Sequence, residues 1–84
     1  MQQTDEARLV FDTLFKKYQS VVLSKKQLGE TLGLSTATID RMRKEGVGPQ
    51  WRRHKNRSIQ YPLTEVANYV VTNQVKTMST DYDK

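Results

Sequence analysis

The feature that most constrains this fold is a pair of helix-start signals eleven residues apart, at Ser24 and Ser35. Ser24 followed by Gln27 forms a capping box, which predicts that a short helix begins directly after the serine. Gly33 suits the left-handed backbone that ends many helices, and Ser35 is a good N-cap for a second helix over about residues 36–44. The chain between the two serines therefore predicts two short helices joined by a tight turn.

The small and apolar residues of this stretch fall where a helix-turn-helix needs them. If the first helical residue is position 1, the residues at positions 4, 5, 8, 9, 10, 15 and 18 are Leu28, Gly29, Leu32, Gly33, Leu34, Ile39 and Met42. A small residue at position 5 lets the helices cross closely, and the apolar positions clamp the second helix against the first. Such a unit presents the N-terminal half of its second helix to a DNA major groove. The alternative is a helical hairpin with ordinary core residues.

An apolar stripe predicts another helix at the N-terminus, over about residues 4–19. Its members recur at three- and four-residue spacing, and they are Ala7, Val10, Phe11, Leu14, Phe15 and Tyr18. Thr4 or Asp5 can cap the start. The stripe is wider than one short helix needs to seal a small core. Part of it is therefore a candidate contact with a second copy or another protein, and the alternative is that all of it is core.

The second half of the chain predicts a β-hairpin over residues 50–61. Trp51, Ile59 and Tyr61 can share its inner face, with arginines and lysines facing outward. The turn is expected at 55–57, where an asparagine tolerates the positive φ that a tight turn requires.

A closing helix is expected over residues 63–74, opened by the proline before it. Residues 77–84 lack periodicity and are expected to be disordered. Together these elements predict a mainly α fold with a small β-hairpin, in a single domain of residues 1–76.

Positive charge is concentrated in one segment. The chain carries +5 overall. Residues 41–57 hold seven basic side chains against one acid, Glu45, so this segment carries +6 and the remainder −1. Clustered positive charge favours a polyanionic partner such as nucleic acid, and the alternative is a solvated basic surface.

The second helix of the pair carries residue types that read duplex DNA. Arg41 can bind guanine through two hydrogen bonds, and Thr36, Ala37 and Thr38 can contact a thymine methyl or a phosphate. Asp40 could accept from a cytosine amine, but we favour a role in holding Arg41 or Arg43 in place.

Basic residues around this helix are placed to meet the phosphate backbone. Lys25 and Lys26 begin the first helix, and Lys44 ends the second. Arg52 adds to the charge of the hairpin.

Several other classes of function find little support in the sequence. No cysteine is present, which removes disulfides and thiolate sites. The one histidine, His54, has no acid placed to orient it, so a basic residue near phosphate is favoured over a catalytic base. Trp51 could stack on a flipped base, but core is the commoner role. We expect no enzyme activity, no cofactor or metal, no membrane segment and a cytoplasmic location.

Residues 23–70 resemble the MerR-like winged-helix modules of phage excisionases and AlpA-type regulators. The resemblance rests on the helix-turn-helix, the link Gly46–Pro49, the strand Arg57–Pro62 and the start of the closing helix at Leu63–Tyr69, which match in order. This chain departs from the family in its additional N-terminal helix, and its wing turn lacks the frequent glycine.

The resemblance implies a winged helix-turn-helix, with the helix-turn-helix at 24–44 and the wing at 50–61. In the family the recognition helix sits in the major groove and the wing touches the neighbouring minor groove or backbone. Carried over, the readers are Thr36, Thr38 and Arg41, and the wing tip is Lys55, Asn56 and Arg57.

The function that follows is sequence-preferring binding of double-stranded DNA by a small protein of a mobile element. Two roles, transcriptional regulator and excisionase-like recombination accessory factor, fit equally. The alternatives are a DNA-processing accessory protein, for conjugation or of the terminase small-subunit kind, and a protein-interaction module that binds no DNA.

Overall fold

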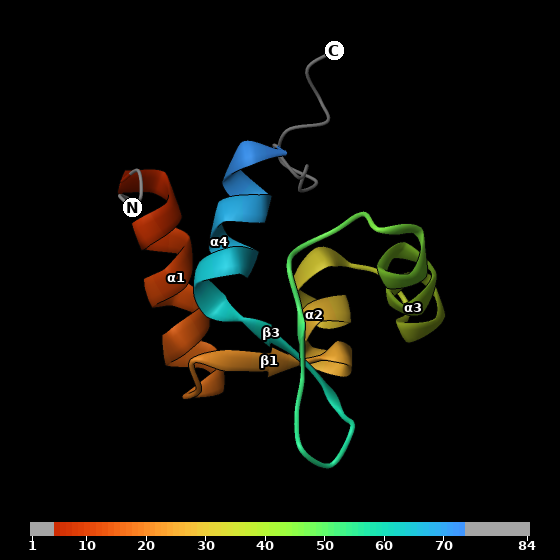
Figure 1. Cartoon of the computed structure of the whole chain (residues 1–84). Coiled ribbons are helices and arrows are strands. Elements are labelled where there is room, and N and C mark those ends of the chain that lie inside the picture. Colours follow the sequence, from red (N-terminus) through yellow and green to blue (C-terminus); the bar gives the residue numbers. More distant parts are fainter. Residues whose placement is uncertain (1–4, 74–84) are drawn as a thin grey trace.

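The computed structural model describes residues 5–73 and contains four helices and three short strands in this range (Figure 1). In chain order they are α1 (Asp5–Tyr18), β1 (Val22–Ser24), α2 (Lys25–Leu32), α3 (Thr36–Glu45), β2 (Arg52–Arg53), β3 (Ile59–Pro62) and α4 (Leu63–Thr72). The predicted mainly α fold with a small hairpin is confirmed. The expected Thr4 cap, the last residue of the expected closing helix and the tail at 77–84 lie outside the described residues.

The sheet has one strand more than the sequence predicted. Its order is β1-β3-β2, and both pairings are antiparallel. The hairpin strands β2 and β3 pair as expected, while β1 joins the other edge of β3, with Leu23 opposite Tyr61. β1 was not predicted as a strand, because three residues are too few to show the alternation that identifies one.

α2, the turn that follows it and α3 have the caps that the sequence predicted. Gln27 N donates to Ser24 Oγ at 3.1 Å, and Ser24 N donates to Gln27 Oε1 at 3.0 Å, which completes the capping box. Gly33 ends α2 with a φ of 73°, and the Ser35 hydroxyl caps α3. At Gly29 a Cβ would lie 2.6 Å from the Leu34 carbonyl oxygen, so a small residue is required here by the backbone of the turn rather than by a helix crossing.

The core lies where α2, α3, α4 and the sheet meet. Its fully buried large side chains come from all of these elements and are Leu23, Leu28, Ile39, Tyr61, Leu63 and Val66. α1 packs alongside α4 (Figure 1). No helix within residues 5–73 has the length and hydrophobicity to cross a bilayer.

The apolar stripe of α1 is divided between core and surface. Ala7 and Leu14 are buried, Phe11 is half-buried against the core, and Phe15 keeps 40% of its surface exposed. The rings of Phe11 and Phe15 stack at 6.5 Å between centroids. One edge of the stripe therefore seals the domain, and the other remains open on this chain.

Candidate nucleic-acid interface

The outer face of α3 carries most of the residues expected to read DNA. Thr36, Ala37, Arg41 and Lys44 are exposed, whereas Ile39 on the opposite side is fully buried. This follows from helical periodicity, since Ala37 and Arg41, two positions from Ile39, point to the other side of the helix, and Thr36 is exposed in the first turn. The structure therefore brings these four predicted residues together on one helix.

Thr38 belongs to the helix cap as well as to this face. It is half-buried, its backbone N–H donates to Ser35 Oγ at 3.2 Å, and its hydroxyl oxygen lies 3.0 Å from the same Oγ. Thr38 therefore helps to fix the start of α3, and Thr36 and Ala37 are the more accessible residues of the first turn.

Asp40 is an internal partner for cations rather than a free acceptor. Its carboxylate oxygens lie 3.1 Å from Lys25 Nζ and 3.2 Å from Arg43 Nη2. The hydrogen bond from Lys25, supported by that from Arg43, lowers the pKa of Asp40 below its ordinary value. The expected role in holding an arginine is confirmed, and the arginine is Arg43.

This pairing also alters what Lys25 can do. Lys25 was expected to contact phosphate, but its side chain is only half-exposed and its ammonium group is paired with Asp40. Lys26 is exposed beside it. Of the two lysines, Lys26 is therefore the one more readily available for a phosphate.

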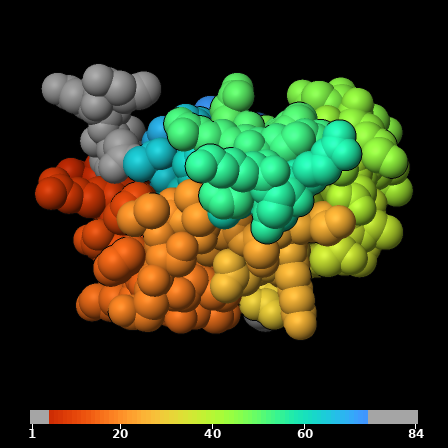
Figure 2. Space-filling model, turned by 60° about the horizontal axis from the view of Figure 1, so that its bottom comes forward, coloured from red at the N-terminus to blue at the C-terminus, as the bar shows by residue number. Residues whose placement is uncertain are grey.

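The hairpin presents an exposed basic surface. Every residue from 51 to 58 is exposed, including the predicted Arg52, Lys55, Asn56 and Arg57. Figure 2 shows the hairpin (green to teal) and α3 (yellow-green) on one face of the molecule. The positive charge that the sequence concentrates in residues 41–57 is thus displayed by two neighbouring elements.

The tip of the hairpin has its positive φ at Arg57 rather than at Asn56. Arg57 N donates to His54 O at 2.8 Å, His54 N donates to Ser58 O at 2.8 Å, and Arg57 has a φ of 71°. This is a three-residue loop, in which the last residue takes the left-handed conformation. Asn56 instead stabilises the turn through its side chain, because its Oδ1 accepts from the backbone N–H and the hydroxyl of Ser58.

Trp51 occupies a position that the sequence did not predict. It was expected on the inner face of the hairpin with Tyr61, but it is 37% exposed and lies between two arginines. The guanidinium carbons of Arg43 and Arg53 are 5.5 Å and 5.7 Å from its ring centroid, within the range of cation–π attraction. Tyr61 is the residue that fills the core, and burial raises the pKa of its hydroxyl.

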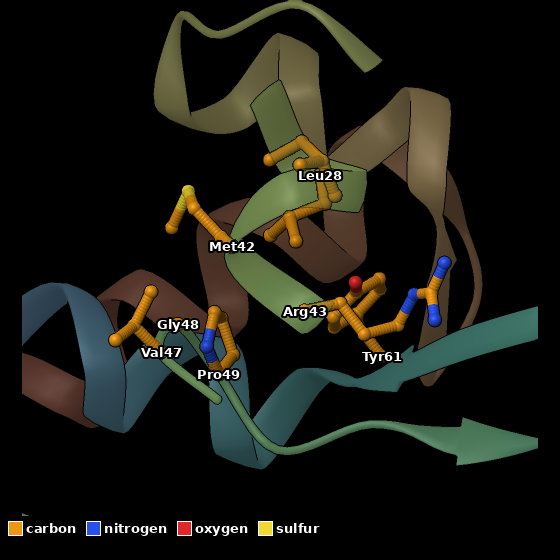
Figure 3. Close-up of a pocket in the computed structure, with 8 residues that line it drawn as sticks. Leu28, Met42, Arg43, Val47, Gly48, Pro49 and Tyr61 are labelled. Carbon is orange, nitrogen blue, oxygen red and sulfur yellow. The ribbon is translucent and has the colours of Figure 1, made fainter. Parts of the chain in front are cut away.

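The link after α3 determines where Trp51 emerges. Pro49 is buried, and Gly48 has a φ of 97° and lies so close to Met42 that a Cβ would approach its methyl group to 3.2 Å. These residues line a crevice with Leu28 and other core side chains that leaves no room for a water molecule (Figure 3). The crevice is therefore packing rather than a ligand site, and it anchors the chain that leads into the hairpin.

Arg43 was considered from the sequence only as one of two arginines that Asp40 could hold, and its contact with Trp51 was not predicted. Its side chain is only 17% exposed, and Figure 3 shows it extending past Tyr61. Its Nε is buried and makes no hydrogen bond. The i,i+3 spacing from Asp40 was a usable signal, but nothing in the sequence alone distinguished Arg43 from the neighbouring Arg41.

Within residues 5–73, no group of three His, Asp or Glu side chains is arranged to hold a metal ion. No family model matches this chain, and no curated protein matches it either. The described surface thus offers cationic side chains and hydrogen-bond donors on an exposed helix and an exposed hairpin.

Proposed function

We propose that this chain binds double-stranded DNA with a sequence preference, as a winged helix-turn-helix protein. α3 enters the major groove with its N-terminal half, and the hairpin touches the neighbouring minor groove or backbone. The observation that carries the proposal is the exposure of the DNA-reading residue types of α3 and of the basic hairpin, two elements that lie next to each other in Figure 2. An α-helix fits the major groove of B-DNA, where each base pair has a distinct pattern of donors and acceptors.

In this proposal α3 reads the bases, and the basic residues of the hairpin and around α3 position the protein on the phosphates. Arg41, exposed on α3, reads guanine, while Thr36 and Ala37 contact thymine methyl groups or phosphate. The basic residues around them neutralise phosphates, which fixes the register without reading sequence. This second group comprises Lys26, Lys44, Arg52, Lys55 and Arg57, with Lys25 contributing only where it leaves Asp40.

The same contacts serve two biological roles. A transcriptional regulator and an excisionase-like accessory factor of a mobile element both require a small protein that marks one DNA site. Because the difference lies in the neighbouring sites and partner proteins, we propose the shared step, DNA binding, and infer that one of these two roles uses it.

Salt dependence tests the proposal most simply. If about five phosphates are neutralised, the logarithm of the binding constant should fall with the logarithm of salt concentration at a slope of about −4 to −5. A labelled duplex titrated at several salt concentrations gives this slope. A Lys16→Gln, Lys17→Gln variant is the matched control, because it removes two charges from α1 and should leave the slope unchanged. No binding at low salt, or a flat response, would contradict the proposal.

The open edge of α1 supports a second proposal, self-association through the Phe11 and Phe15 pair. Phe15 is 40% exposed although it stacks on the half-buried Phe11, and aromatic residues are enriched at protein interfaces. Phe15→Ser should reduce the mass of a dimer to that of a monomer, as measured by light scattering, without unfolding the domain. A monomeric parent protein at high concentration, with and without DNA, would contradict it.

A further inference from the structure

A continuous series of side-chain contacts connects α3 to the tip of the hairpin. Asp40 holds the guanidinium of Arg43 at 3.2 Å, and that guanidinium lies 5.5 Å from the centroid of Trp51. Arg53 lies 5.7 Å from the same ring, and its Nη1 donates to the carbonyl oxygen of Arg57 at 3.5 Å. The path therefore starts on the proposed recognition helix and ends at the residue with the left-handed backbone in the hairpin turn.

The rest of the hairpin is held weakly. β2 consists of Arg52 and Arg53, both exposed, and it pairs only with Gln60 and Ile59. Residues 52–58 bury no side chain, so apolar packing does not fix the outer strand and the turn against the core. Trp51 is the large apolar side chain at the start of this strand, and it lies between cations from both elements.

Arg43 is suited to act as the fixed side of this connection. Its side chain is mostly buried, and its charge is balanced on one side by Asp40, which also binds Lys25 of α2. A guanidinium held by a carboxylate keeps a constant orientation, and its flat face is free to stack on an aromatic ring. Trp51 is thus bound to a group that moves with α3.

We propose that Trp51 is a positioning residue that sets the hairpin at a constant distance from α3, so that both elements meet the same duplex in register. The consequence for DNA rests on the proposed function, whereas the mechanical connection does not. Loss of the ring should release the hairpin tip while leaving the core intact, because the fully buried side chains belong to other positions.

The test compares Trp51→Leu with Trp51→Phe. Leucine keeps apolar bulk but cannot attract cations to a ring face, whereas phenylalanine keeps an aromatic face. Backbone relaxation measured by NMR on residues 54–58 should show faster motion in Trp51→Leu, and motion close to that of the parent in Trp51→Phe. The same spectra report whether α2, α3 and α4 stay folded.

The DNA readout is the effect of Lys55→Ala in each background. In the parent protein this substitution should weaken binding about three- to tenfold at moderate salt, as expected for one phosphate contact. In Trp51→Leu it should weaken binding less than about twofold, because the tip no longer reaches its phosphate, and Trp51→Phe should restore the parent effect. If Trp51 only stabilised the fold, Trp51→Leu would lower the DNA affinity, but Lys55→Ala would weaken binding by the same factor in both backgrounds.

The failures of the two proposals are distinguishable. Unchanged hairpin motion in Trp51→Leu overturns the positioning role, whatever the DNA result. An equal effect of Lys55→Ala in all three backgrounds overturns its consequence for binding, while the salt-dependent binding of the parent still supports the proposed function. If the parent binds no duplex, the proposed function fails, and the NMR comparison still decides whether Trp51 positions the hairpin.

Discussion

α3 and the hairpin are both exposed and basic, but they are attached to the domain in different ways. α3 is held by the buried Ile39, by caps at both ends and by the ion pairs of Asp40. The hairpin tip depends on two paired residues and on one tryptophan between two arginines. Reading bases requires donors held to a fraction of an ångström, whereas a contact with phosphate tolerates more freedom. The firm attachment of α3 therefore suits its proposed role in reading bases, and the weaker attachment of the hairpin suits its proposed contact with phosphate.

The largest effect should come from the core beneath α3. Ile39→Ala removes a fully buried side chain, and we expect the free energy of unfolding to fall by about 2–4 kcal/mol. Lys55→Ala in the hairpin should change it by less than about 0.5 kcal/mol. Urea denaturation followed by circular dichroism measures both. Similar losses in the two variants would mean that the hairpin is as strongly integrated as α3.

The next largest effect should be the loss of DNA affinity when the proposed base-reading residue is removed, compared with the loss of a phosphate contact. Arg41→Ala should cost about 1–3 kcal/mol on the preferred duplex, selected from a random pool, and much less on random DNA. Lys55→Ala should weaken both duplexes alike. Binding of each variant to each DNA gives the comparison. If the hairpin variant changed the preference and Arg41→Ala did not, the roles of the two elements would be reversed.

Arg57 allows the conformational cost of the hairpin tip to be separated from its charge. Its φ of 71° is costly for a residue with a side chain, by about 1 kcal/mol. Arg57→Gly should therefore be about 1 kcal/mol more stable than Arg57→Ala in thermal unfolding, since both lose the charge and only glycine relieves the backbone. Both should bind duplex DNA equally weakly. Equal stability of the two variants would argue against the left-handed turn.

The smallest effect concerns pH and the ion pairs behind α3. Because its cationic partners lower the pKa of Asp40 in the folded state, the stabilisation is complete above the unfolded value of 3.8 and is lost as the pH falls through the lower, folded value. Unfolding of the parent protein and of Asp40→Asn at a series of acid pH values tests this. The difference in stability between them should shrink as the pH falls below 3.8, and a constant difference would contradict the assignment.

The sequence predicted α2, α3 and the turn between them well because their signals are local. Ser24, Gly33 and Ser35 act on backbone groups within four residues, so each cap could be assigned without knowledge of the fold. The exposed face of α3 followed from helical periodicity once its start was fixed. β1 could not be assigned in the same way, because its partner is Tyr61, far along the chain.

The two misplaced residues depend on different things, Trp51 on contacts between distant segments and Arg57 on the geometry of its loop. Trp51 was expected in the core, but the close packing of Gly48 and Pro49 beneath α3 directs it toward Arg43. Arg57 carries the positive φ because in a three-residue loop the left-handed position is the last one, after the asparagine that was expected to take it. The turn lies at residues 55–57, as the sequence predicted, whereas the contact of Trp51 with Arg43 is set by tertiary structure that the local sequence does not specify.

The most direct test of the central claim is an NMR map of the surface that meets DNA. Backbone amide shifts of the parent protein should be followed during titration with the preferred duplex. We predict that the largest changes fall on residues 36–44 and 54–58, with small changes on α1. Changes concentrated on α1 and α4, with α3 and the hairpin unaffected, would contradict the proposed interface.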